Sequence, residues 1–117
     1  MIACNVKGDN HIGDARAHHL IAYEFKDHEV IKTLNMDINH PSNGIMLYKR
    51  HHIGNHADYR YAMRLELDRI QRSPRSQWKY EVIKLRNSAG YALYNGAPLL
   101  KRHGSRPGVW RRIFRGR

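Results

Sequence analysis

The chain has 117 residues, of which 41% are hydrophobic and 26% charged, so a single globular domain with a modest core is favoured and wholesale disorder is excluded. No apolar run approaches the ~18 residues that a membrane-spanning helix needs. We expect no signal peptide, because Lys7, Asp9 and Asp14 lie where its apolar region would be. The single cysteine, Cys4, excludes an internal disulfide and a cysteine-rich zinc site.

The net charge of +11 is concentrated in one half of the chain. Residues 1–60 hold seven Lys/Arg and seven Asp/Glu, whereas residues 61–117 hold fourteen and three. Eight of the nine histidines lie in the neutral half. Because Lys and Arg gain affinity by releasing counterions from polyphosphates, the basic half indicates a nucleic-acid partner. A solubilising surface or a patch for a membrane surface is the alternative.

The first half of the chain predicts short elements joined by turns. Residues 1–14 show no periodicity and are expected to form a loop. The mostly apolar segment 18–25 predicts a strand or an extended arm, and residues 28–35 predict a short helix. Proline and Asn-Gly place a turn at 39–44, and a short strand is expected at 45–48.

The clearest predicted helix covers residues 56–72, in which Met63, Leu67 and Ile70 share one face. Asn55 is a good N-cap, and Ser73-Pro74 ends the helix.

Beyond this helix the pattern is weaker. Residues 78–85 alternate weakly, as is typical of a strand, and turns are expected at 87–90 and 95–98. The Arg-rich end from 101 is expected to be partly mobile. We predict one domain over residues 1–117, with its core at about 15–72 and a basic extension over 73–117.

Three clusters of polar residues form a candidate site: His18-His19, Asn43-Gly44, and His51-His52 followed by Gly54 and His56. If segments 18–25 and 45–48 pair as strands and the helix packs across them, the clusters meet at one end. His52 and His56 are four residues apart and can converge on one ion, although His51 could replace His52 in another loop register. The remaining histidines, His11, His28, His40 and His103, are expected to be solvated.

The two adjacent histidines are predicted to have different roles. Side chains of neighbouring residues in an extended chain point to opposite sides, so one of His18 and His19 could bind metal while the other acts as a base. Phosphodiester hydrolysis needs both, because a metal ion neutralises the phosphate and an imidazole accepts a proton from water at neutral pH.

At these positions the sequence resembles the AHH nucleases of the HNH/endonuclease VII superfamily, which are common as toxin domains of bacterial polymorphic toxins and secretion-system effectors. The resemblance covers residues 15–70, and residues 1–14 and 73–117 match nothing recognisable. Its motifs are Ala17-His18-His19-Leu20, Asp37-Ile38-Asn39, Ser42-Asn43-Gly44-Ile45-Met46-Leu47 and His52-Ile53-Gly54-Asn55-His56-Ala57-Asp58-Tyr59.

The resemblance implies an α+β fold with a ββα-metal core and hydrolysis of nucleic-acid phosphodiesters. It implies that His18, His52 and His56 hold a divalent ion (Zn²⁺, Mg²⁺ or Ni²⁺), and that His19 is the general base. Asn43 would fix the loop that carries His19, and Tyr59 would lie near the metal site.

The leading interpretation is a metal-dependent, largely non-specific endonuclease, a DNase rather than an RNase, that acts as an antibacterial toxin. Such a toxin would be a monomer translocated into the cytoplasm of a target cell, with DNA, or RNA, and an acidic immunity protein as partners and no membrane. The residues expected to contact nucleic acid are basic: Arg16, Lys49, Arg50, Arg60, Lys101, Arg102, Arg111 and Arg112.

Two other functions are compatible with the sequence. One is a sequence-specific HNH endonuclease of a mobile element or restriction system, and the other is a non-catalytic nucleic-acid-binding protein with a structural zinc. For the C-terminal residues we favour binding of phosphates. The alternative is that Trp110, Ile113 and Phe114 complete the core.

Overall fold

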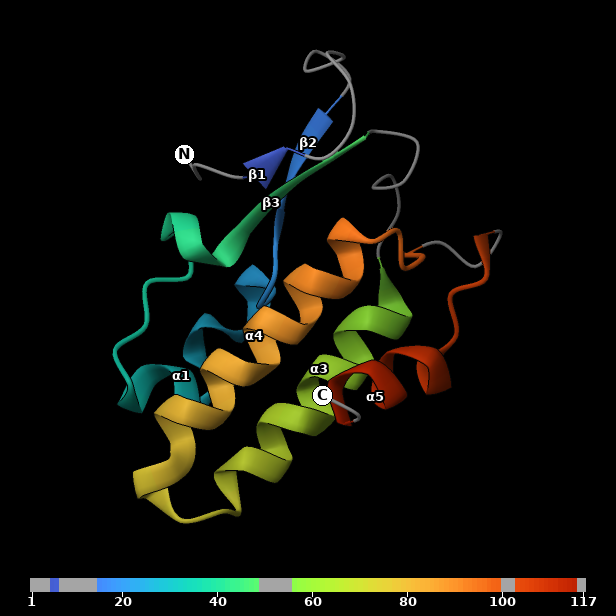
Figure 1. The fold of residues 1–117 in the computed structure, drawn as a ribbon. Coiled ribbons are helices and arrows are strands. Elements are labelled where there is room, and N and C mark those ends of the chain that lie inside the picture. The colour runs from blue at the N-terminus through green and yellow to red at the C-terminus, as the bar shows by residue number, and fades with distance from the viewer. Residues whose placement is uncertain (1–4, 7–14, 49–55, 100–102, 116–117) are drawn as a thin grey trace.

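The computed structural model describes residues 5–6, 15–48, 56–99 and 103–115. A small sheet lies at one end of the molecule, and the longer helices pack side by side beneath it (Figure 1). The strands and α-helices, in chain order, are β1 (Asn5–Val6), β2 (Ala15–His19), α1 (Glu29–Thr33), β3 (Gly44–Tyr48), α3 (Ala57–Gln71), α4 (Trp78–Tyr94) and α5 (Pro107–Arg115).

The sheet has the strand order β1-β3-β2. β2 and β3 are antiparallel, with His18 opposite Ile45 and His19 opposite Gly44, whereas β1 runs parallel to β3. Two antiparallel strands followed by α3 form the ββα unit, and the α+β fold class is confirmed.

The strand expected over residues 18–25 is wrong beyond His19. The chain turns after β2 and enters a 3₁₀ helix at Tyr23–Asp27. The reason is that the side chain of Asn43 satisfies both backbone groups of Ile21, the N–H and the C=O, in place of a neighbouring strand.

The expected strand and turn over residues 78–90 are also wrong, because α4 is one helix of 17 residues. Its buried residues recur at helical spacing, a period that weak alternation in a short window conceals. Gly90 does not end the helix but permits close packing, since a Cβ there would lie 3.3 Å from Leu20 Cδ1. The buried residues of α4 are Trp78, Val82, Leu85, Ala89 and Leu93.

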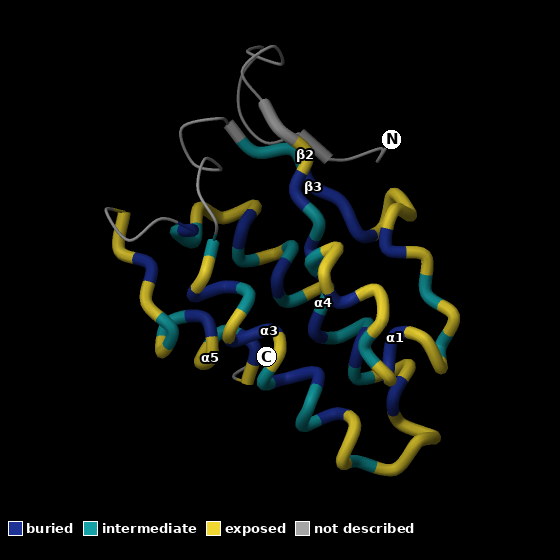
Figure 2. Tube along the Cα trace, turned by 180° about the vertical axis from the view of Figure 1, so that it is seen from behind, coloured by how far each residue is buried: buried dark blue, intermediate teal, exposed yellow. Residues whose placement is uncertain are grey.

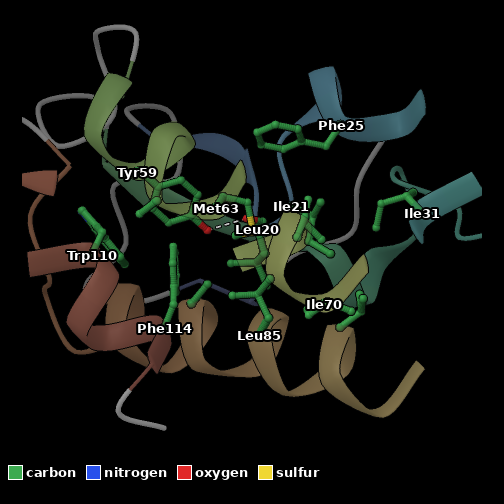
Figure 3. Close-up of a cluster of buried hydrophobic side chains, with 14 of the residues drawn as sticks. Leu20, Ile21, Phe25, Ile31, Tyr59, Met63, Ile70, Leu85, Trp110 and Phe114 are labelled. Carbon is green, nitrogen blue, oxygen red and sulfur yellow. Dashed lines mark hydrogen bonds between the residues drawn. The ribbon is translucent and has the colours of Figure 1, made fainter. Parts of the chain in front are cut away.

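The Arg-rich end forms a helix, α5, over Pro107–Arg115, and this helix packs against α3. Trp110 and Phe114 are fully buried, and their rings lie 4.6 and 5.6 Å from the ring of Tyr59 (Figure 3). The C-terminal segment therefore completes the core, which was the less favoured expectation.

The core lies between the end of β2 and helices α3, α4 and α5, and the outward helix faces are exposed (Figure 2). The predicted helix over 56–72 is confirmed, with Met63, Leu67 and Ile70 fully buried. None of the helices in the described part of the chain is long and apolar enough to cross a membrane.

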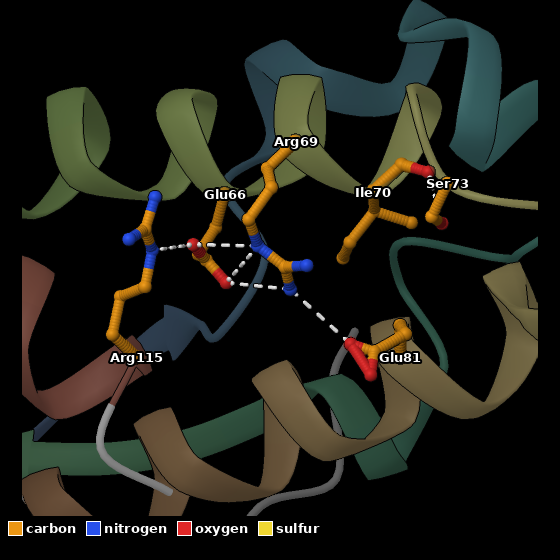
Figure 4. Close-up of polar contacts among 6 residues, drawn as sticks. All are labelled: Glu66, Arg69, Ile70, Ser73, Glu81 and Arg115. Atoms are coloured by element: carbon orange, nitrogen blue, oxygen red, sulfur yellow. Dashed lines mark hydrogen bonds and ion pairs between the residues drawn. The ribbon is translucent and has the colours of Figure 1, made fainter.

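An ion-pair network joins the three long helices (Figure 4). The buried carboxylate of Glu66 on α3 accepts hydrogen bonds from Arg69 and from Arg115 of α5. Arg69 also donates to Glu81 of α4, at 3.2 Å. The hydrogen bond with Glu66 raises the pKa of Arg69, so this guanidinium stays charged.

Candidate functional site

Two of the predicted metal ligands lie together where β2 approaches the start of α3. The imidazole of His18 is buried and that of His56 is half-buried, and their ring centroids are 5.4 Å apart. Tyr59, one turn along α3, packs the edge of its ring against His18 at 5.1 Å. His56 precedes the helix with a left-handed backbone, φ 50°.

This separation of the two imidazoles fits a shared ion. With metal–nitrogen bonds of about 2.1 Å at a tetrahedral angle, two imidazole centroids lie roughly 5 Å apart. The predicted third ligand, His52, and its substitute His51 lie outside the described residues. Within the described ranges, no group of three metal-ligating side chains is present.

His19 extends from β2 on the side of the strand opposite to His18. Its Nε2 lies 2.8 Å from Oδ1 of Asn39, and its ring lies 5.9 Å from that of Tyr23. An amide oxygen only accepts hydrogen bonds, so this contact places the proton on Nε2 and leaves Nδ1 as the acceptor. The contact thus leaves one ring nitrogen of His19 able to accept a proton.

Asn39 was not among the predicted site residues. The signal that points to it is its place in the Asp37-Ile38-Asn39 motif, whose first residue turns the chain: Asp37 Oδ1 accepts from the N–H of Asn39 at 2.9 Å. Sequence alone does not give the distance from Asn39 to the imidazole.

Asn43 is 1% exposed and holds two chain segments together. Its Oδ1 accepts from Ile21 N–H, while its Nδ2 donates to the carbonyls of Ile21 and Ile38. One segment follows His19 and the other leads to Asn39. Asn43 therefore fixes backbone, and Asn39 contacts the imidazole.

Tyr59 ties α3 to the same loop by donating its hydroxyl proton to the carbonyl of Leu20. Burial raises the pKa of Tyr59, so the hydroxyl stays protonated.

The predicted nucleic-acid contacts are only partly described. Arg60 is half-buried and pairs with Glu24 at 3.2 Å, whereas Arg111 and Arg112 are exposed on α5. Arg16 lies on β2, but its side chain is outside the described part. Lys49, Arg50, Lys101 and Arg102 also lie outside it.

His28 is not solvated as expected. Its side chain is 12% exposed, and Nε2 lies 2.9 Å from Asp68 Oδ1 on α3. Nδ1 accepts from the N–H of Val30 and so caps α1. Its role is to join α1 to α3.

The family comparison bears on the same residues. A model described as a nuclease family of the HNH/ENDO VII superfamily with conserved AHH matches residues 4–89, which extends past the motifs into α4. Ala17-His18-His19 supplies the three residues of that description. No curated protein and no solved structure matches the chain. With a match over most of its length, and with the ββα unit around those histidines, the chain belongs to the AHH nuclease family of the HNH/endonuclease VII superfamily.

Proposed function

We propose that this domain is a metal-dependent endonuclease that hydrolyses phosphodiester bonds, preferentially in DNA and with little sequence specificity. The observation that carries the proposal is the pair of imidazoles, His18 and His56, at ligand spacing beside a third imidazole oriented as a base. Metal binding and proton transfer are thus assigned to opposite sides of the end of β2.

Each residue has a distinct task in hydrolysis. Nδ1 of His19 accepts a proton from water while Asn39 holds the Nε2–H, and the oxygen of that water attacks phosphorus. The bond from phosphorus to the leaving oxygen breaks, that oxygen takes up a proton from solvent water, and His19 returns its proton to solvent. His18, His56 and, by family resemblance, His52 would hold a divalent ion, which would supply positive charge to the scissile phosphate.

The biological setting follows from family resemblance and charge. We propose a translocated antibacterial toxin domain, acting as a monomer in the target-cell cytoplasm and inhibited by an acidic immunity protein. The net charge of +11 supports both partners, since a nucleic acid and an acidic protein bind a basic surface.

A cleavage assay tests the enzyme. Plasmid, single-stranded DNA and RNA are incubated with the protein after chelation and readdition of Mg²⁺, Mn²⁺, Zn²⁺ or Ni²⁺. We expect a smear from plasmid with at least one ion and no product in chelator. His19→Ala should lower the cleavage rate by about 10²- to 10⁴-fold because the base is lost, while metal affinity by calorimetry stays nearly unchanged.

The matched control is His28→Ala, which removes a histidine whose partner Asp68 lies about 18 Å along α3 from His56. It should cleave at the wild-type rate below its melting temperature. A His19→Ala variant whose cleavage rate is within tenfold of the wild-type rate would exclude His19 as the base. Discrete bands from the plasmid would indicate a sequence-specific enzyme. Stable DNA binding without cleavage in every ion would indicate a structural zinc protein.

A further inference from the structure

The outer face of α4 carries three exposed tyrosines. Tyr91 is 76% exposed, Tyr80 63% and Tyr94 48%. They alternate with Lys84 and Asn87 at steps of four and three residues, which places all five on one face of the helix. We call Tyr80, Lys84, Asn87, Tyr91 and Tyr94 the α4 stripe.

The charge beside the α4 stripe is positive. Nζ of Lys84 lies 5.0 Å from the centre of the Tyr80 ring, and Lys79 and Arg86 lie on the adjoining row of the helix. The acidic residue of α4, Glu81, is paired with Arg69. The stripe therefore presents aromatic rings with one cation, Lys84, among them and two more cations beside it.

Two clefts open along this side of α4, of about 360 and 400 Å³. Both are lined by Arg86 and Ser42, whose Nη1 and Oγ atoms are 3.2 Å apart. Tyr91 and Tyr94 line the first cleft. The stripe and this cleft thus form one continuous surface.

The first cleft leads to the catalytic strand. Its other wall includes Leu20, which follows His19, and Gly44, which pairs with His19 across the sheet. A chain lying on the α4 stripe and entering this cleft would therefore reach the backbone that carries the base.

We propose that the α4 stripe binds a single-stranded nucleic acid, whose unpaired bases stack on the tyrosines while Lys84 and Arg86 contact its phosphates. The proposal rests on the proposed function and adds to it a binding surface for the unpaired bases of DNA or RNA. Exposed aromatic rings interleaved with cations are the surface that single strands require, because every base offers a face for stacking. A duplex keeps its bases stacked inside and has no use for the tyrosines.

The stripe is also long enough for several nucleotides. From Tyr80 to Tyr94 the helix rises about 21 Å, so bases in succession can meet different rings. An acidic protein could pair with the cations, but it would not need three exposed aromatic rings spaced along the helix. The observations therefore favour nucleic acid.

Binding is measured by fluorescence anisotropy with labelled oligo(dT) and with a duplex, in the His19→Ala background so that the probes stay intact. Tyr91→Ala should weaken oligo(dT) binding by about 5- to 100-fold, the range for losing one stacked base, and change duplex binding less than about twofold. Lys84→Ala should weaken both probes and flatten the salt dependence of log affinity by ~0.7 on the single strand.

The chain supplies a matched control on α3. Tyr61 is 44% exposed with the guanidinium of Arg64 5.9 Å from its ring, the same pairing on another helix. Tyr61→Ala and Arg64→Ala should leave oligo(dT) affinity within about twofold. Equal losses from Tyr61→Ala and Tyr91→Ala, or equal losses on both probes, would overturn the proposal.

Two further outcomes separate this proposal from its rivals. Unchanged oligo(dT) binding by Tyr91→Ala with weakened binding of polyglutamate would assign the stripe to an acidic protein and overturn the proposal. Wild-type protein that binds oligo(dT) through the stripe but cleaves nothing would overturn the proposed function and support this one.

Discussion

Asn39 and Asn43 support His19 in different ways. Asn39 is exposed and contacts the imidazole of His19, whereas Asn43 is buried and contacts backbone. The family resemblance predicts His19 as the base and predicts that Asn43 hydrogen-bonds across the loop that carries it, and the structure places the bonds of Asn43 on the backbone of that loop. The role of Asn39 depends on a distance across twenty residues, which no local pattern encodes.

The two asparagines should separate stability from catalysis. Asn43→Ala leaves three buried backbone groups of Ile21 and Ile38 without their partner, so we expect a loss of about 2–4 kcal/mol in the free energy of unfolding together with lower activity. Asn39→Ala should change stability by less than ~0.5 kcal/mol yet lower kcat, because its exposed side chain contacts only the imidazole in the described structure.

Urea denaturation and initial cleavage rates on the same preparations check this pair. Asn39→Gln serves as the conservative control, since its amide oxygen can reach the imidazole at the cost of side-chain ordering. Two results would contradict these separate roles of Asn39 and Asn43. One is an Asn39→Ala variant that cleaves at the wild-type rate, and the other is an Asn39→Ala variant that unfolds at the same lowered urea concentration as Asn43→Ala.

At the scale of elements, the sequence predicted what is encoded locally and missed what depends on distant contacts. The helix at 56–72 was predictable because Met63, Leu67 and Ile70 repeat with the helical period. In α4 the tyrosines of the outer face break the amphipathic pattern, so the buried face is hard to recognise. In α5 the two aromatic residues were considered as a possible part of the core, but their burial against Tyr59 is a long-range contact that the sequence does not decide.

α5 is therefore expected to act first through packing. Trp110→Ala should lower the free energy of unfolding by about 3–5 kcal/mol, because a fully buried indole and its hydrogen bond to the Pro98 carbonyl are lost. Arg111→Ala with Arg112→Ala should leave stability nearly unchanged, since both side chains are exposed.

Thermal melts and the salt dependence of DNA affinity distinguish these roles. If the two arginines bind phosphates, the slope of log affinity against log salt on duplex DNA should flatten by ~0.9 for each lost contact. A Trp110→Ala variant that melts with the wild type would show that α5 does not stabilise the fold. An unchanged slope in the double variant would remove both arginines from the interface.

At the scale of the whole molecule, the proposed ion would connect the sheet to α3 through His18 and His56. A ligand that binds only the folded chain stabilises it by about 2.7 kcal/mol at a hundredfold excess over its Kd. For a chain of this length the corresponding rise in Tm is about 10 °C. His56→Ala should abolish this rise, because the helix loses its ligand.

Differential scanning fluorimetry with and without each ion measures the effect. His28→Ala is the control: it removes the contact with Asp68 and should lower the basal Tm, yet retain the ion-dependent rise. A His56→Ala variant that still gains the full shift would remove His56 from the ligand set.

At position 56 the left-handed backbone favours one type of residue for stability, whereas metal binding requires another. Asn and Gly adopt this conformation more easily than His does, so either should make the metal-free domain more stable. Neither carries an imidazole. Selection for thermal stability alone would therefore replace this histidine. Relatives that keep the histidine should be those in which cleavage is still under selection. Catalytically dead descendants of the domain should be found with Asn or Gly here.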